Sequence, residues 1–328
     1  MKLATSVDIP NERKPDYRKA KWLQWITIVY LISVVFVLYL VMGSSQAMRA
    51  AWLEDLLSLV PSIAWTITTP IAWRKPDPKF PYGYHRSVSI GYLAASLPLL
   101  LLGLFLVGDA AMKLVQAEHP TMGTLVIFGQ PVWIGWPALL ALIYSSVPSV
   151  ILGRMKLKLA DRLHDKVLYA DAKMRKADWM TAGAAMIGII GVGFGIWWLD
   201  AAAALVIGLD VIRDGFTQTK HAIGDLTDRR PMTTTQEKEE DLPERVRNQL
   251  CRLDWVKDAQ VRLREAGHIL YGQGFVVPTV DRVAVETISK AADDITRMDW
   301  RLAEFVLTPV TSFDGSNANG ETGDNGEK

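Results

Sequence analysis

The sequence predicts a helical membrane protein that carries a small α+β domain at its carboxyl end. Half of the 328 residues are hydrophobic although 22% are charged, so the two kinds must be segregated along the chain. Long apolar runs fill residues 22–216, whereas the region after residue 231 changes to short helix-like and strand-like patterns. This length accommodates one membrane domain and one small soluble domain.

Six apolar segments are predicted to cross the membrane, because about 20 apolar residues span a hydrocarbon core of about 30 Å. The expected spans are 22–42, 50–73, 87–115, 132–153, 178–198 and 201–216. Segment 156–176 is charged but helix-compatible, and we expect it to extend the fifth span into the cytoplasm.

Lysine and arginine set the expected orientation. They concentrate in the amino-terminal tail and in segments 74–86 and 154–176, which places both termini in the cytoplasm. We therefore expect a basic cytoplasmic tail over 1–21 and a transmembrane domain over 22–230. A compact, multi-pass chain without a long histidine-rich loop favours a bacterial inner membrane.

The pattern of the carboxyl-terminal region predicts a cytoplasmic ferredoxin-like domain over 231–311, followed by a disordered tail over 312–328. Its expected order is helix, strand, strand, helix, strand, at 237–252, 255–264, 269–278, 283–298 and 301–308. The strands lack the basic and aromatic pattern of a nucleic-acid platform, and the net charge of +1 gives no reason to expect such a partner.

Several classes of chemistry are excluded or disfavoured. The single Cys251 excludes an internal disulfide and a cysteine metal cage within one chain. No Ser/His/Asp set, zinc-protease helix or phosphate loop is present, so we expect no enzyme and no tightly bound cofactor. The five histidines are scattered outside the spans, and we expect them to face solvent.

The fifth span opens with a polar stripe. Asp171, Met174 and Asp178 fall at i, i+3 and i+7, which is one face of a helix. A carboxylate carried into a bilayer indicates an ion or proton path. The alternative is that Asp178 is a helix-end residue among the lipid headgroups.

The second span contributes further oxygen atoms. Glu54 and Ser58 are an i, i+4 pair, and Asp55, Ser58 and Ser62 form an alternative stripe. Pro61 lacks the amide that would bond the carbonyl of residue 57, which frees that carbonyl for a cation or water. The alternative is that the two acids only stabilise the positive end of the helix dipole.

Asp210 is a possible further intramembrane acid in the sixth span. It lies about 15 Å along a helix from Asp200, which is near mid-membrane, and Asp214 follows one turn later. Arg213 offers the alternative of a charge pair at a frayed helix end.

Several motifs together resemble the cation diffusion facilitator family. Segment 80–86 (FPYGYHR) is similar to the family's entry to the third span, and Asp178, the run 198–201 (WLDA) and the run 226–228 (LTD) are similar to its fifth-to-sixth-span signature. The resemblance covers roughly residues 20–310. It implies a usually homodimeric exporter of divalent transition metals in exchange for protons.

The resemblance places four metal-ligand positions at Glu54, Ser58, Met174 and Asp178. The family's zinc-type set is three Asp and one His, so Ser58 and Met174 depart from it. Asp171, Asp55 or Asp210 are candidates for the missing ligands. A set of carboxylates, hydroxyls and water suits Mn²⁺, Mg²⁺ or, less clearly, Fe²⁺, and we expect Mn²⁺ or Fe²⁺ to be preferred over Zn²⁺. Met174 would favour a softer ion if it were a ligand.

Three more expectations follow from the resemblance. Arg86 and Asp228 occupy the positions of the family's charge interlock at the membrane hinge, and we expect them to pair. A second metal site at Asp77 is expected to be absent, because Phe80 and Tyr84 replace its histidines. The departures from the zinc set also motivate an alternative function, a metal-sensing or assembly protein that keeps the fold without transport.

Overall fold

The protein is described here by a computed structural model that covers residues 9–41, 52–53, 55–116, 124–127, 130–133, 135–194, 196 and 198–313. The chain divides into two compact units. The helical unit reaches Glu239 and also includes the short segment Glu265–His268. The carboxyl-terminal unit comprises Glu240–Arg264 and the chain from Ile269 onward.

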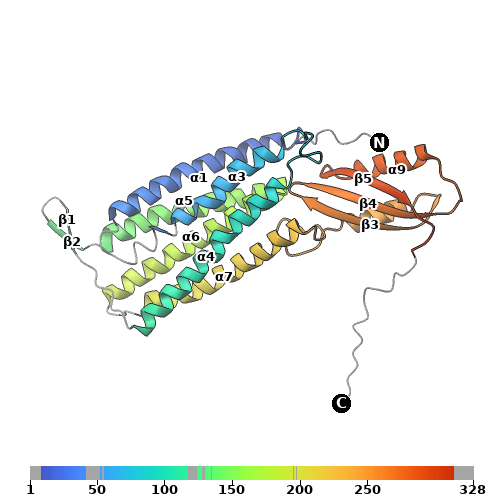
Figure 1. Ribbon diagram of the computed structural model, residues 1–328. Coiled ribbons are helices and arrows are strands. Elements are labelled where there is room, and N and C mark those ends of the chain that lie inside the picture. Colours follow the sequence, from blue (N-terminus) through green and yellow to red (C-terminus); the bar gives the residue numbers. More distant parts are fainter. Residues whose placement is uncertain are drawn as a thin grey trace, which may run out of the picture. The chain divides into compact units, whose positions relative to one another are not determined.

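Long helices running side by side make up the helical unit (Figure 1). The amino-terminal end of α1 and the carboxyl-terminal end of α7 lie at the same end of this unit. Residues 52–53 and 55–57 are also helical and precede a turn at Ser58. The helices are α1 (Lys14–Val41), α3 (Leu59–Ala72), α4 (Ser87–Val115), α5 (Gly135–Leu163), α6 (Lys166–Gly193) and α7 (Leu199–Leu226).

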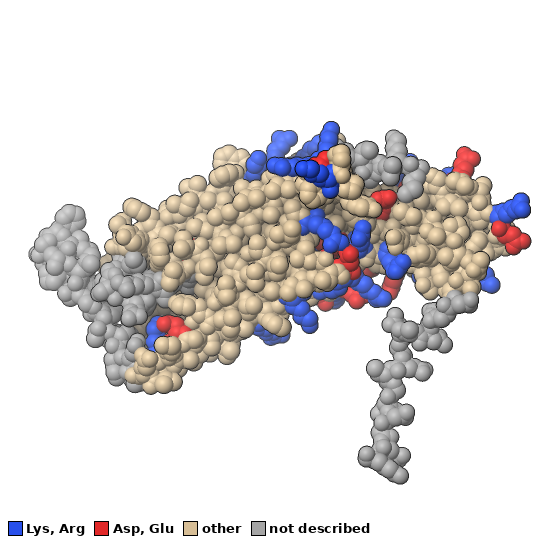
Figure 2. Space-filling model, viewed as in Figure 1, with Lys and Arg blue, Asp and Glu red and all other residues tan. Residues whose placement is uncertain are grey.

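Three of the described helices are long and apolar enough to cross a membrane, namely α1, α4 and α5. The described part of α3 has only 14 residues, while α6 and α7 combine apolar turns with charged ones. Figure 2 shows a long flank of the helical unit without charged side chains, and lysine and arginine gather near the loop between α3 and α4. The chain is therefore an integral membrane protein, and the six-span topology remains an expectation.

The structure corrects the expected boundaries in two places. Residues 124–133 contain an unexpected antiparallel hairpin, β1 (Thr124–Ile127) and β2 (Gln130–Trp133), so the helix expected from 132 begins at Gly135. Segment 156–176 is not one helical extension, because α5 ends at Leu163 and α6 begins at Lys166. His164 has a left-handed φ of 54°, and Asp165 Oδ1 accepts the amide hydrogen of Leu168 at 2.9 Å, which caps α6.

Glycines allow α4 and α7 to pack closely. A Cβ atom at Gly215 of α7 would lie 2.5 Å from the Leu100 amide nitrogen, and one at Gly103 of α4 would lie 2.6 Å from the Ile212 nitrogen. Small residues at such crossings let two membrane helices bring their backbones together. The pairing of α4 with α7 thus depends on the absence of side chains at these positions.

The carboxyl-terminal unit has the predicted order of elements. A three-stranded sheet has the order β3-β4-β5, and β4 pairs with β5 in parallel, with Leu270 opposite Leu302. The two-residue connection between β3 and β4 is typical of an antiparallel pair, so the sheet is mixed. The elements are α8 (Leu242–Leu250), β3 (Val256–Ala266), β4 (Ile269–Pro278), α9 (Val285–Thr296) and β5 (Leu302–Pro309).

The core of this unit forms because each element buries one face. Leu242, Val246 and Leu250 of α8 are fully buried, as the i, i+4, i+8 spacing predicts. They belong to one cluster with Ala291 and Ile295 of α9 and with inward-facing side chains of the three strands. An amphipathic helix pair on a sheet therefore holds this unit together.

Candidate metal site between α3 and α6

Buried carboxylates on and just before α6 meet polar side chains of α3 and the turn before it in three successive layers. Asp171 and Asp178 are seven residues apart, which keeps them near one face of α6, and Asp165 directly precedes the helix. All three are at most 3% exposed. Their partners are Trp65, whose Nε1 donates to Asp165 at 2.5 Å, Ser62, whose hydroxyl donates to Asp171 at 3.0 Å, and Ser58, whose hydroxyl donates to Asp178 at 2.5 Å.

The Asp178 layer contains a basic residue next to the carboxylate. Arg175 Nη1 lies 2.8 Å from Asp178 Oδ2, and its Nη2 donates to the Ser58 carbonyl at 2.5 Å. The contact of Arg175 Nη1 with Asp178 Oδ2 is an ion pair without hydrogen-bond geometry. This buried carboxylate oxygen can therefore still accept a hydrogen bond or a metal ion. The carbonyl engaged here belongs to Ser58, one residue beyond the one that Pro61 was expected to free.

Asp55 adds a second carboxylate to this layer. It is 5% exposed, and Ser145 of α5 lies within hydrogen-bond distance at 3.4 Å. It is close enough to Asp178 and Arg175 to interact with both electrostatically. The stripe of Asp55, Ser58 and Ser62 therefore faces the interior, and Glu54 lies outside the described residues.

The Asp171 layer is closed by a buried lysine. Lys156 of α5 forms an ion pair with Asp171, and both side chains are 0% exposed. Lys156 Nζ also donates to Gln24 of α1 at 2.9 Å, and Arg175 Nε lies 3.7 Å from Asp171 Oδ1. Asp171 lies about 10 Å from Asp178 along the helix axis. The negative charge of Asp171 is therefore balanced by Lys156 and by the Nε side of Arg175.

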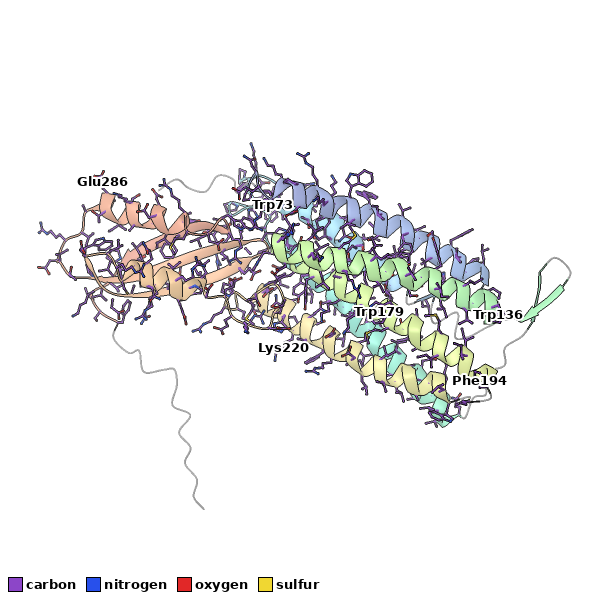
Figure 3. The ribbon with its side chains drawn as sticks, turned by 180° about the vertical axis from the view of Figure 1, so that it is seen from behind. Trp73, Trp136, Trp179, Phe194, Lys220 and Glu286 are labelled. Carbon is purple, nitrogen blue, oxygen red and sulfur yellow. The ribbon has the colours of Figure 1, made fainter. Side chains whose placement is uncertain are left out.

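The Asp178 layer lies between the two ends of the helical unit. In Figure 3, Trp179 is found between Trp73 at one end and Trp136 and Phe194 at the other. Asp178 precedes Trp179 on α6 and so lies at the same level of the bundle. Asp178 therefore lies at an intermediate level of the helical unit and not at either end of it.

Two other predicted site residues lie elsewhere. Met174 is 0% exposed and packs in an apolar cluster with Leu99 and Leu102 of α4, as a core methionine does. Asp210 of α7 pairs with Lys176 of α6 at 3.2 Å, and these side chains are 45% and 42% exposed. The structure therefore places Asp210 on the outside of the α6–α7 pair.

The end of the bundle at Asp165 holds two histidines that we expected to face solvent. His85 and His268 are only 5% and 6% exposed, so that expectation was wrong for both. The Trp73 ring stacks on His268 at 5.7 Å and meets the edge of His85 at 6.0 Å. Burial, and secondarily the nearby His268, lowers the pKa of His85 to about 4.

A charged cluster accompanies these histidines. Lys166 Nζ lies 2.8 Å from Asp225 and 2.7 Å from Glu265, and all three side chains are buried. Next to Glu265, Gly267 has a φ of 65°, and a Cβ there would lie 2.3 Å from the His85 carbonyl oxygen. The segment 265–268 is thus fixed by ion pairs and by a glycine that no other residue replaces without strain.

Arg86 and Asp228 meet in the structure. Arg86 pairs with Asp228 and donates to the Leu226 carbonyl at 3.1 Å. Asp228 adopts a left-handed φ of 58°, which aspartate tolerates better than most residues. Both side chains are more than 40% exposed. The pair joins the start of α4 to the residues that follow α7.

The loop at Asp77 is closed on itself. Tyr84 donates its hydroxyl hydrogen to Asp77 at 2.5 Å, and the amides of Lys79 and Phe80 donate to the same carboxylate at 2.8 and 2.9 Å. The Tyr84 hydrogen bond lowers the pKa of Asp77 below its usual range. Tyr84 and Phe80, which replace the histidines of the family's second site, therefore donate the hydrogen bonds that hold Asp77 within its own loop.

No group of three or more His, Cys, Asp or Glu side chains is arranged to hold a metal among the residues that the structure describes. The oxygen donors nearest to such a set are those of Asp178, Ser58 and Asp55. They are hard ligands of the kind that Mn²⁺ accepts. Whether they can bind a cation depends on Arg175, which shares their layer.

From the sequence, the basic residues Lys156 and Arg175 were not assigned to the site. Lys156 and Arg175 were counted only as loop charges that set orientation. The spacing held a signal, because Arg175 lies at i+4 from Asp171 and i−3 from Asp178, and so on their face.

Comparison with known proteins identifies the class of this chain. The cation efflux transmembrane domain family matches residues 23–227, which is more than half of the chain. The chain belongs to this family of transporters, which is the family that the motifs indicated. It is a membrane transporter by class and not a catalytic enzyme.

Among curated relatives, the chain is similar to the manganese efflux system protein MneS of Bacillus subtilis, with 27% identity over 184 residues, or 55% of this chain and 59% of that protein. It is 25% identical to the uncharacterized transporter YdbO of the same organism over 60% of this chain and 64% of that protein. Manganese efflux system protein MneP of that organism is 23% identical over 79% of this chain and 82% of that protein. The matches to MneS and YdbO span less than two thirds of those proteins.

Proposed function

We propose that this protein exports a divalent transition-metal cation from the cytoplasm in exchange for protons, with Mn²⁺ or Fe²⁺ preferred over Zn²⁺. The observation that carries this proposal is the buried contact between Ser58 and Asp178 at 2.5 Å, which joins two helical segments at mid-bundle level. A buried carboxylate at such a position is the usual mark of an ion path in a membrane protein.

The donor chemistry supports the choice of ion. Asp178, Asp55, Ser58 and the Ser58 carbonyl are all oxygen donors, and Met174 packs away in an apolar cluster. Zinc sites in proteins are built mainly from His and Cys, which the described layer lacks. The relatives MneS and MneP are named manganese efflux proteins, which agrees with an ion that prefers oxygen ligands.

Proton exchange follows from sharing the same oxygens. A carboxylate that binds a metal must be ionised, and a proton that takes its place releases the metal. Asp178 and Asp55 interact electrostatically within one layer. A proton or a metal ion that binds to one carboxylate therefore changes the electrostatic energy of the other. We propose that the α3 and α6 sides of the site alternate in opening to the two sides of the membrane, in a homodimer held by its carboxyl-terminal units.

A second candidate function is metal sensing or assembly without transport. The observation that favours it is the charge balance of the site, because Arg175 and Lys156 are both fully buried against Asp178 and Asp171. Such pairs satisfy the carboxylates without any metal. Under this alternative the protein binds metal, if at all, without moving protons.

Proton flux from reconstituted vesicles separates the two. Purified protein in vesicles that contain a pH-sensitive dye would receive Mn²⁺, Fe²⁺, Co²⁺, Zn²⁺ and Mg²⁺ in turn. We expect proton flux with Mn²⁺ or Fe²⁺, a weaker signal with Zn²⁺, and none in Asp178→Asn. Metal binding without flux from any ion would favour the second function, and an equal Zn²⁺ signal would refute the ion preference.

A further inference from the structure

Arg175 contacts the oxygens that the proposed site would use. Its Nη1 lies 2.8 Å from Asp178 Oδ2, and its Nη2 donates to the Ser58 carbonyl at 2.5 Å. The Arg175 side chain is 0% exposed and that of Asp178 is 1% exposed. One guanidinium therefore engages a carboxylate and a carbonyl that a metal ion would also need.

We propose that Arg175 is an intramolecular competitor of the transported cation. Its guanidinium holds Asp178 and the Ser58 carbonyl, and a metal ion gains these oxygens only when the guanidinium moves away. This inference rests on the proposed function, because it assigns a role in metal selection and exchange to a residue beside the ligands.

Electrostatics makes the two cations mutually exclusive. Two positive charges a few ångströms apart repel strongly where water is excluded, because the interaction scales inversely with the local dielectric constant. A dication bound at Asp178 Oδ2 would lie within such a distance of Nη1. Metal binding is thus coupled to movement of the guanidinium.

The surroundings of Arg175 provide a second position for the guanidinium. Its Nε lies 3.7 Å from Asp171 Oδ1, so the group lies between two carboxylates of α6. A Cβ atom at Gly153 of α5 would lie 3.0 Å from the Arg175 Cβ, which means that α5 packs closely against the base of the side chain. The base is fixed, and the long distal part can turn from Asp178 toward Asp171, which exchanges one carboxylate partner for another.

Asp171 can accept this second charge because its own partners are adjustable. It is held by Lys156 and by the hydroxyl of Ser62, at 3.0 and 3.1 Å to its two oxygens. Lys156 Nζ at the same time donates to Gln24 at 2.9 Å, so the lysine keeps a polar partner when its contact with Asp171 loosens. The Asp171 layer therefore works as the position to which the Arg175 charge moves when the metal occupies Asp178.

A purely structural role for Arg175 makes the opposite prediction. If the guanidinium only stabilises the fold, its removal leaves Asp178 unpaired and disorders the ligands, so metal affinity falls. If it competes, its removal frees the ligands and affinity rises. The direction of the change in affinity separates the two roles.

Mn²⁺ affinity of the purified full-length protein in nanodiscs tests the inference, with free Mn²⁺ followed by its electron paramagnetic resonance signal. We expect Arg175→Gln to bind Mn²⁺ at least tenfold more tightly than the wild type. Arg175→Lys should lie between the two, because a lysine keeps the charge but cannot hold Asp178 and the Ser58 carbonyl in the same fork. The matched control is Lys176→Gln, which removes a neighbouring charge paired with Asp210 outside the site and should not change affinity.

The outcomes are distinguishable. Wild-type binding with equal or weaker binding by a folded Arg175→Gln protein overturns the inference and leaves the proposed function intact. If Arg175→Gln does not fold, Arg175→Lys decides in the same way. Absence of Mn²⁺ binding by the wild type and by both Arg175 variants, together with absence of transport, refutes the proposed function itself.

Discussion

The hydroxyl of Ser58 donates a hydrogen bond to Asp178 Oδ1 at 2.5 Å, although the two residues are 120 positions apart in the chain. Both residues are buried, with Ser58 at 0% and Asp178 at 3% exposure. The contact fixes the turn before α3 against the middle of α6. It therefore sets the distance between the two halves of the proposed metal site.

Replacement of this hydroxyl should impair transport. We expect Ser58→Ala to lower the rate of Mn²⁺ transport about tenfold or more, because a buried hydrogen bond to a charged group contributes about 1.5–3 kcal/mol and 1.4 kcal/mol corresponds to tenfold. The measurement is Mn²⁺ uptake into reconstituted vesicles. Ser146→Ala is the matched control, because the Ser146 hydroxyl donates to the Leu142 carbonyl of its own helix, and transport should be unchanged.

The pair of Arg86 and Asp228 should matter for transport more than for stability. Exposed ion pairs contribute about 0–1 kcal/mol, so Arg86→Gln and Asp228→Asn should change the free energy of unfolding by less than about 1 kcal/mol. Asparagine also tolerates the left-handed φ of 58° at position 228. We expect both variants to transport more slowly, because the pair links the start of α4 to the end of α7.

A double-mutant cycle tests that coupling. If the two side chains act through each other, Arg86→Gln combined with Asp228→Asn is no slower than the slower single variant. Rates that multiply would show that each residue acts alone.

Close packing of α4 on α7 gives a prediction about stability. At Gly215 an added methyl group would collide with the Leu100 backbone nitrogen at 2.5 Å, so Gly215→Ala should destabilise the protein by about 1–3 kcal/mol, the usual cost of overpacking. Thermal unfolding in detergent measures this. Gly108→Ala on α4 is the control, because no atom lies within 4 Å of an added Cβ, and a loss of stability there would argue against the packing explanation.

Burial of His85 predicts a dependence of stability on pH. Its pKa is about 4 in the folded protein, against about 6.5 in an unfolded chain, so below pH 6.5 the unfolded state binds the proton first. The free energy of unfolding should therefore fall as the pH drops from 6.5 toward 4, by at most about 2 kcal/mol at pH 5. Unfolding of the wild type and of His85→Gln at pH 7.5 and pH 5 measures it, and an equal loss in both would contradict the assignment.

The order of helices and strands could be predicted because periodicity and turn residues are local signals. The bounds 87–115 and 269–278 agree with α4 and β4, where apolar or alternating patterns run between clear breaks. The break at His164 was not predicted, since Leu163 and Val167 suit a continuous helix and the stop depends on one left-handed residue and an aspartate cap. The β1–β2 hairpin was missed because its four-residue strands carry too short a pattern.

The sequence pointed to two acids of the proposed site, Asp178 and Asp55, and not to its basic residues. Asp178 and Ser58 follow from an acid inside an apolar run and from motif spacing. The roles of Arg175 and Lys156 follow from tertiary contacts, because a lysine on α5 meets an aspartate on α6 only after the helices pack. Met174 illustrates the opposite case, in which a motif position is filled by a residue that the fold uses for apolar packing.

Mn²⁺ entry into vesicles, followed by quenching of an enclosed metal-sensitive dye, tests the central claim most directly. The three proteins to compare are the wild type, Asp178→Asn and Asp210→Asn, the last of which removes a carboxylate outside the site. We predict rapid entry with the wild type and with Asp210→Asn, and none above empty vesicles with Asp178→Asn. Transport by Asp178→Asn at the wild-type rate would contradict the account, because the cation would then cross without the carboxylate on which the site is built.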